Sequence, residues 1–105
     1  MDELVIERAL RAIEAIPPGR VISYGDLAGL VGITARQAGS LLARHGHGTP
    51  WWRVVNAAGE LPAHLRDEAA GHWAREGITT RPNGACRISC HRADLVALAR
   101  IVDAP

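Results

Sequence analysis

The feature that most constrains this sequence is a pair of helix-start signals lying close together near its middle. Ser23, followed three residues later by Asp26, fits a capping box, in which two side chains satisfy free backbone amides at a helix start. The short helix that follows is expected to end at Gly32. Thr34 is a second helix cap and opens a helix over 35–44. Two short helices joined by a tight glycine-containing turn predict a helix-turn-helix.

The residues that flank this pair predict further helices. Apolar residues at helical spacing indicate an amphipathic helix over 3–16, which Pro17-Pro18-Gly19 would end. A second helix is expected over about 66–76, with Gly77 just past its end, and a last one over 92–102. The chain is therefore expected to be mainly helical.

A few short segments favour extended structure. Val21-Ile22 is expected to be extended, and 51–56 reads as a short buried strand or a turn. Asn-Gly in Pro82-Asn83-Gly84, between the β-prone runs 78–80 and 86–88, is typical of a hairpin. The sequence thus predicts a mainly α, winged-helix-like domain with a small β-hairpin and a central helix-turn-helix.

Length and charge limit the function classes. With 105 residues the chain is long enough for one domain, which we place at 1–105, and too short for a TIM barrel. The net charge is only +1, but residues 16–58 carry four Arg against one Asp. A local basic stretch in a nearly neutral chain is a weak signal for nucleic-acid binding.

The remaining composition favours a protein of the cytoplasm. The start Met1-Asp2-Glu3 is acidic where a secretory signal is basic, and no apolar run approaches the ~18 residues of a membrane span. Two cysteines form no disulfide framework. We expect a cytoplasmic monomer, nucleoid-associated if the source is bacterial, with no membrane partner and no cofactor or metal.

Four short sequence motifs, taken in order, resemble those of a known family. Their order and spacing are similar to those of the DNA-binding domain of the O6-alkylguanine-DNA alkyltransferases, and weaker similarity extends the match over roughly residues 5–77. The motifs are Ile16-Pro17-Pro18-Gly19, Val21-Ile22-Ser23-Tyr24-Gly25-Asp26-Leu27-Ala28, Ala35-Arg36-Gln37-Ala38-Gly39 and Pro50-Trp51-Trp52-Arg53-Val54-Val55.

The sequence departs from this family at the reactive residue. Alkyltransferases carry Pro-Cys-His-Arg, in which the Cys accepts the alkyl group, whereas this chain has Pro50-Trp51-Trp52-Arg53. Trp at the acceptor position resembles the alkyltransferase-like proteins, which bind alkylated DNA without repairing it. Most of those carry His or Gln after that Trp, so Trp52 is a further departure.

The chemistry of the replaced residues agrees with a loss of transferase activity. Dealkylation requires a nucleophile such as a thiolate, helped by a neighbouring base. An indole nitrogen only donates a hydrogen bond. Glu76 matches the acid that orients the family's His, and we expect it to be left without that partner. We therefore predict that the protein is not an enzyme.

The resemblance also implies a DNA-binding face. The helix that begins at Thr34 would enter the minor groove, where its small residues allow close approach. Arg36 matches the arginine that fills the stack left by a flipped base, and Tyr24 matches the tyrosine that pushes the 3′ phosphate. The residues expected to contact DNA are Ser23, Tyr24, Thr34, Ala35, Arg36, Gln37, Gly39 and Ser40.

A pocket for the alkylated guanine is expected beside this face. If 51–56 is a strand, alternation sends one Trp to the core and the other to the pocket, and we assign Trp51 to the pocket. Either His64 or Arg66 would sense the lesion. The flagged lesion would pass to nucleotide excision repair proteins. The expected pocket residues are Tyr24, Pro50, Trp51, Trp52, Arg53, Val54, His64 and Arg66.

Three other readings remain open from the sequence. Ser89-Cys90-His91-Arg92 repeats a Cys-His-Arg word, so an active alkyltransferase using Cys90 is one alternative. Cys86, Cys90 and His91 are soft ligands for zinc, although their spacing is unusual and no fourth ligand is evident. The helix-turn-helix also suits a sequence-specific transcription regulator that reads the major groove.

Overall fold

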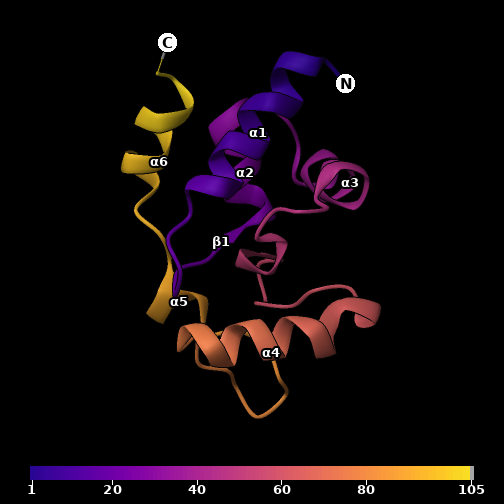
Figure 1. Cartoon of the computed structure of the whole chain (residues 1–105), viewed down its shortest axis with the longest axis vertical. Coiled ribbons are helices and arrows are strands. Elements are labelled where there is room, and N and C mark those ends of the chain that lie inside the picture. The colour runs from indigo at the N-terminus through magenta and orange to yellow at the C-terminus, as the bar shows by residue number, and fades with distance from the viewer. Residues whose placement is uncertain (105) are drawn as a thin grey trace.

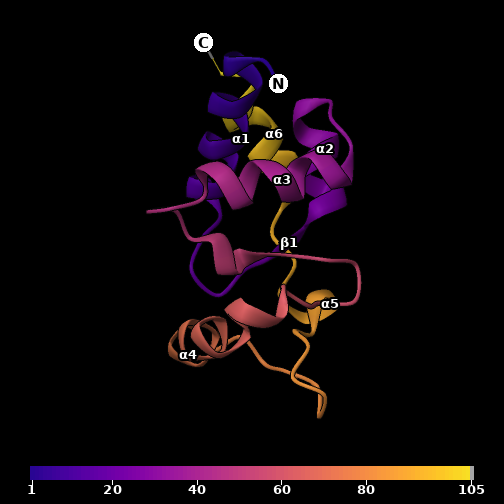
Figure 2. The ribbon, with the colours of Figure 1, turned by 90° about the vertical axis from the view of Figure 1, so that its right-hand side faces the viewer.

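The computed structural model describes residues 1–104, and these form two layers with a short parallel sheet between them (Figures 1 and 2). Helices α1, α2, α3 and α6 form one layer, and α4 and α5 lie in the other (Figure 2). In chain order the elements are α1 (Glu3–Ala15), β1 (Ile22–Ser23), α2 (Tyr24–Val31), α3 (Ala35–His45), the 3-10 turn η1 (Trp51–Arg53), β2 (Val54–Val55), the 3-10 turn η2 (Ala63–Leu65), α4 (Arg66–Glu76), α5 (Ile88–His91) and α6 (Leu95–Val102).

Both predicted caps of the helix-turn-helix are present. Asp26 N donates to Ser23 Oγ at 3.0 Å, and Ser23 N donates to an Asp26 carboxylate oxygen at 2.9 Å. Thr34 caps α3 in the same way, with Gln37 closing the box at 2.9 and 3.1 Å. Gly32 ends α2 with a φ of 77°, a conformation that glycine adopts without the steric cost of a Cβ. These local signals therefore determine the position of both helices.

The two-residue strands divide the hydrophobic core in two. β1 and β2 are parallel, with Ile22 opposite Val54 and Ser23 opposite Val55. Successive strand residues point to opposite faces of a sheet. Val54 accordingly packs with the four-helix layer, whereas Val55 packs with the layer of α4. One short strand pair thus joins the layer of α3 to the layer of α4.

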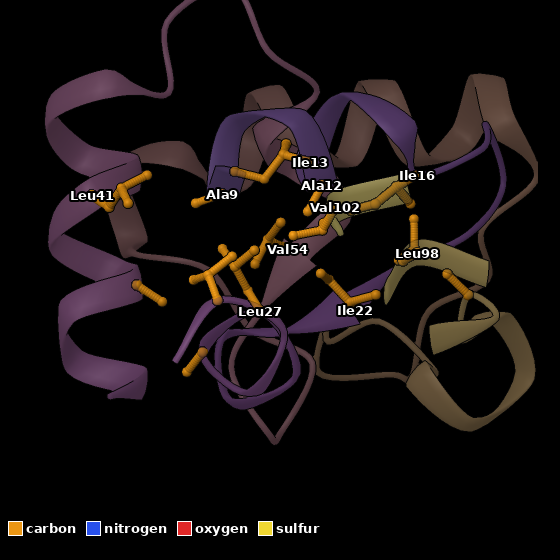
Figure 3. Packing of buried hydrophobic residues seen from close by; sticks show 14 residues of the cluster. Ala9, Ala12, Ile13, Ile16, Ile22, Leu27, Leu41, Val54, Leu98 and Val102 are labelled. Carbon is orange, nitrogen blue, oxygen red and sulfur yellow. The ribbon is translucent and has the colours of Figure 1, made fainter. Parts of the chain in front are cut away.

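The larger cluster fills the space between α1, α2, α3 and α6 (Figure 3). Ile13 of α1, Leu27 of α2, Leu41 of α3 and Leu98 of α6 are each at most 2% exposed. Burying one such side chain contributes about 1.5–3 kcal/mol. Trp73 of α4 is 4% exposed and belongs to the second cluster. α3 is therefore packed against a rigid support.

The predicted hairpin is reduced to a single antiparallel bridge between Thr80 and Cys86. Cys86 N donates instead to Gly59 O at 2.8 Å, and the chain turns into α5 at Ile88. The small sheet of the mainly helical fold is the parallel pair of β1 and β2. Sequence patterns could not indicate this pairing, because its two strands lie far apart in the chain.

Helix ends agree closely with expectation, except at the last helix. α1 and α4 match the expected ranges to within one residue, and Gly77 follows α4 in a left-handed conformation. α6 begins at Leu95 and not at 92, because the Asp94 carboxylate caps it by accepting from Ala97 N at 3.1 Å. Within residues 1–104, no helix has the length and apolar character that crossing a membrane requires.

Candidate nucleic-acid interface

A cavity of about 510 Å³ opens between α3, η1 and the segment that leads into α4. This volume lies within the range of about 300–1,000 Å³ that is usual for small-molecule sites. Most of its wall is apolar, with two imidazoles and one carboxylate at the edges. It is lined by Tyr24, Gly39, Leu42, Ala43, Gly46, His47, Trp51, Leu61, Pro62, His64, Leu65 and Glu68.

The cavity takes in three of the eight residues expected to form a pocket. These three are Tyr24, Trp51 and His64. Of the two alternatives for the lesion sensor, only His64 reaches the cavity. The remaining five lie outside the lining of this cavity: Pro50, Trp52, Arg53, Val54 and Arg66.

Each of these five residues lies in a different part of the structure from the cavity lining. Val54 is completely buried in the larger core cluster. Pro50, Trp52 and Arg53 border a separate shallow hollow. Arg66 is exposed, and its Nε donates to Leu61 O at 3.0 Å. The guanidinium therefore braces the cavity wall from outside.

The two adjacent tryptophans point in different directions, but strand alternation is not the reason. Trp51 and Trp52 lie in the 3-10 turn η1, ahead of the strand that begins at Val54. In such a turn, about three residues complete one revolution, so neighbouring side chains diverge by about a third of a circle. Trp51 faces the cavity, and Trp52 faces α4. Trp51 therefore lies on the cavity, as expected, and Trp52 turns away from it. The sequence allowed a strand or a turn over 51–56, and the structure has both, a turn at Trp51–Arg53 and a strand at Val54–Val55.

Glu76, expected to lack the family's His partner, accepts four hydrogen bonds from other groups at the end of α4. Two come from the Arg53 guanidinium at 2.7 and 3.0 Å, one from Trp52 Nε1 at 2.8 Å and one from Gly19 N at 2.9 Å. The Arg53 and Glu76 side chains are each only 12% exposed. Arg53 also donates to Ile16 O at 2.9 Å. The network ties η1 to α4 and to the turn after α1.

The electrostatics of this network keep Glu76 ionised. Burial by itself would raise the pKa of Glu76, but hydrogen bonds from Arg53, Gly19 and Trp52, together with the Arg53 charge, lower it from 4.5 to about 2. Trp52 supplies an N–H donor at the position where the resemblance places a His or Gln. The carboxylate is therefore a structural anchor for the cavity wall.

The exposed face of α3 carries most of the predicted DNA contacts. Ala35, Arg36 and Ser40 are exposed, and Gly39 is half-buried at the cavity edge. Arg36 forms no ion pair with any residue among 1–104. The Gln37 carbonyl oxygen is engaged in the Thr34 cap, which leaves its NH₂ group for other partners. Ser23 Oγ likewise accepts a capping hydrogen bond.

Tyr24 links this face to the cavity. Its ring packs against the larger core cluster and also lines the cavity. Burial raises the pKa of the Tyr24 phenol, so the group stays protonated and able to donate. Its hydroxyl makes no hydrogen bond to any other described side chain or backbone group. The donor is therefore free to bond a ligand at this position.

The downstream cysteines lie apart from the cavity. Cys90 is exposed on α5, and Cys86 is buried in the second core cluster. Burial and the neighbouring Cys90 raise the pKa of the Cys86 thiol to about 11. His91 Nε2 is bonded to Thr79 at 2.8 and 3.0 Å. The part of the chain that is described holds no cluster of three potential metal ligands.

Sequence reasoning missed several residues of this region. His72 stacks on Trp52, and Glu68, Leu42 and His47 line the cavity. The spacing of Glu68, His72 and Glu76, four residues apart along one helix, places all three on one face of α4. This spacing was the one available signal. The C-terminal end of α3 and the loop after it also line the cavity, through Leu42 and His47, and this depends on how that loop folds.

Fold and site together define a helix-turn-helix domain whose second helix borders a cavity. Residues 5–78 match the sequence family described as "6-O-methylguanine DNA methyltransferase, DNA binding domain". The chain belongs to this family. Its resemblance to the alkyltransferase-like members is also confirmed.

Similar proteins agree with this assignment. A "DNA base-flipping protein" of Escherichia coli (strain K12) is 44% identical over 59 residues, which cover 52% of this chain and 46% of that protein. The match thus spans about half the length of that relative. A protein of the same description from Vibrio parahaemolyticus is 34% identical over 71 residues, covering 64% of this chain and 70% of the relative.

A solved structure supports the fold. The crystal structure of S. pombe Atl1 in complex with damaged DNA containing O6-carboxymethylguanine matches with a TM-score of 0.68 and 21% identity. The match covers 93% of this chain and 95% of the other. At this identity the likeness establishes the mainly helical architecture, including the arrangement of both layers.

Proposed function

We propose that this protein recognises O6-alkylguanine in double-stranded DNA without removing the alkyl group. α3 enters the minor groove, and the damaged nucleotide rotates out of the helix into the cavity beside Trp51. The observation that carries this proposal is the position of the cavity. It opens directly beside the exposed face of α3, between the Tyr24 phenol and the Trp51 indole.

The exposed face of α3 suits a minor groove of about 6 Å width. Ala35, Gly39 and Ser40 are small, so the helix backbone can come close to the DNA. Arg36 carries a free planar guanidinium, which can stack in the place of the flipped base and donate to the orphaned cytosine. The Tyr24 hydroxyl is free to donate to a phosphate. Of these residues, Tyr24 and Gly39 also line the cavity.

The energetics favour a damaged base over an intact one. Flipping costs a few kcal/mol and is cheapest at a weakened pair, such as one that contains O6-alkylguanine. Stacking of a base on an aromatic side chain returns about 1–3 kcal/mol. The apolar wall formed by Trp51, Leu42 and Leu65 gives an alkyl group a surface to pack on. Weak pairing and apolar packing therefore act in the same direction.

The cavity lining contains no cysteine thiol to accept an alkyl group. The indole of Trp51 has no basic lone pair, and its neighbour Trp52 is turned away toward Glu76. Cys90 lies on α5 and does not line the cavity. Binding without transfer leaves the lesion in place. We propose that the bound complex marks it for nucleotide excision repair, with the protein acting as a cytoplasmic monomer that is nucleoid-associated if the source is bacterial.

A competition binding assay tests this proposal. Duplexes that contain guanine or O6-methylguanine in several flanking sequences compete for the protein at one stated salt concentration. We expect tighter binding to the lesion in every flank. Equal affinity for both bases would refute the proposal, and a preference for one flank whatever the base would indicate a transcription regulator. Labelled methyl should stay on the DNA; its transfer to protein, abolished in Cys90→Ala, would instead establish an active alkyltransferase.

A further inference from the structure

The tryptophan that faces the cavity is oriented by a second aromatic layer behind it. The rings of Trp52 and His72 are stacked, with centroids 3.6 Å apart and an interplanar angle of 4°. The Trp51 ring stands nearly perpendicular to both, at 85° and 5.7 Å from Trp52 and at 83° and 6.0 Å from His72. Trp51 thus rests on a two-ring platform.

No hydrogen bond within residues 1–104 fixes the orientation of the Trp51 ring, so ring contacts and packing alone set its direction. Trp52, by contrast, is fixed by its bond to Glu76 at 2.8 Å, and the Arg53 guanidinium lies 5.4 Å from its ring centroid. His72 is the second ring of this stacked pair, so its position also affects the surface on which Trp51 packs.

His72 is itself held in one orientation. The Arg75 guanidinium donates to His72 Nδ1 at 3.1 Å. Because a guanidinium only donates, Nδ1 accepts, and the ring proton of this arrangement lies on Nε2. The imidazole ring lies flat against the Trp52 ring. His72 does not line the cavity, so its effect on a bound base would pass through Trp52 and Trp51.

We propose that His72 is a positioning residue for lesion recognition, holding the Trp52 ring and through it the Trp51 face in the orientation that receives the flipped base. This inference rests on the proposed function and adds to it a residue outside the DNA-binding face. An aromatic pair contributes about 0.5–1.5 kcal/mol, which corresponds to an effect of about 2- to 10-fold on affinity. The effect should fall on the lesion complex, because undamaged DNA does not fill the cavity.

Two substitutions at one position provide the test. His72→Ala removes the ring, whereas His72→Phe keeps a flat aromatic ring and loses both ring nitrogens, including the Nδ1 that contacts Arg75. Affinities are measured for duplexes with guanine and with O6-methylguanine, and ¹⁹F spectra of fluorotryptophan-labelled protein report the order of Trp51, whose signal is assigned with Trp51→Phe. Thermal melts check folding, and His72→Leu replaces the Ala variant if that variant unfolds.

The expected result separates positioning from simple stability. His72→Ala should lower the preference for the lesion about 2- to 10-fold, leave undamaged binding unchanged and mobilise Trp51, while His72→Phe behaves like the wild type. An unchanged preference with an unchanged Trp51 signal, or an equal loss on both duplexes, would overturn the inference. If the wild type shows no lesion preference, the proposed function fails, and the ¹⁹F signal alone decides whether His72 orients Trp51.

Discussion

Replacing Glu76 with Gln should expose how much the buried network contributes to stability. The substitution keeps the shape of the side chain and mimics the protonated acid, but it leaves the Arg53 charge buried without a counter-ion. Lowering the pKa of Glu76 from 4.5 to about 2 corresponds to about 3 kcal/mol in favour of the folded state, at about 1.4 kcal/mol per tenfold. Loss of one partner from a buried ion pair typically costs about 3–5 kcal/mol.

The effect should depend on pH with a defined sign. Because folding lowers the pKa of this acid, its contribution is complete above pH 4.5 and is lost as the pH falls toward about 2. The wild type should therefore exceed Glu76→Gln by about 3 kcal/mol at pH 7, and the difference should shrink between pH 5 and pH 2.

Urea denaturation at a series of pH values, followed by tryptophan fluorescence, measures this difference. Glu14→Gln is the matched control, since Glu14 is exposed and forms none of the ion pairs found among residues 1–104. The control should stay within about 0.5 kcal/mol of the wild type. A Glu76→Gln protein within about 1 kcal/mol of the wild type at pH 7, or a difference that does not change with pH, would refute the argument.

Three further predictions concern the backbone and the thiols. Gly59→Ala should lower the free energy of unfolding by more than about 2 kcal/mol, because a Cβ there would lie 2.1 Å from Cys86 O at a φ of 82°. Gly84→Ala, at a φ of 87° in open space, should lower it by only about 1–2 kcal/mol. Equal urea midpoints for the two variants would contradict this prediction. Thr34→Ala should lose about 1 kcal/mol of unfolding free energy and Thr34→Ser much less, and equal losses would count against the cap. A thiol reagent at pH 8 should titrate exposed Cys90 in native protein and buried Cys86 only after denaturation, and two fast thiols would disprove this assignment.

Local signals allowed the sequence to predict the recognition elements. Ser23 and Thr34 accept hydrogen bonds from backbone amides in the first turn of their own helices, so their capping role can be predicted without knowing any tertiary contact. Gly32 and Gly77 take up the left-handed conformations expected at helix ends. The helix-turn-helix and the boundaries of α4 followed from these short-range rules.

The composition of the cavity required tertiary information. Val54 and Trp52 are near neighbours of Trp51 in sequence, yet the change from a 3-10 turn to a strand directs the three side chains into different environments. The donors that replace the family's His at Glu76 could not be identified from the sequence, because they come from η1 and from the turn at Gly19, both distant in sequence. The pattern of residues within one segment does not predict contacts between segments that are distant in sequence.

The most direct test of the account compares the wild type with Trp51→Ala on duplexes containing guanine or O6-methylguanine. The ratio of the two dissociation constants isolates recognition of the lesion from general DNA binding. We predict that the wild type prefers the lesion and that Trp51→Ala reduces this preference about 5- to 150-fold, the equivalent of 1–3 kcal/mol of stacking, with undamaged binding retained. A wild-type ratio of one, or a preference that Trp51→Ala leaves unchanged, would contradict the proposal that the cavity beside Trp51 receives the damaged base.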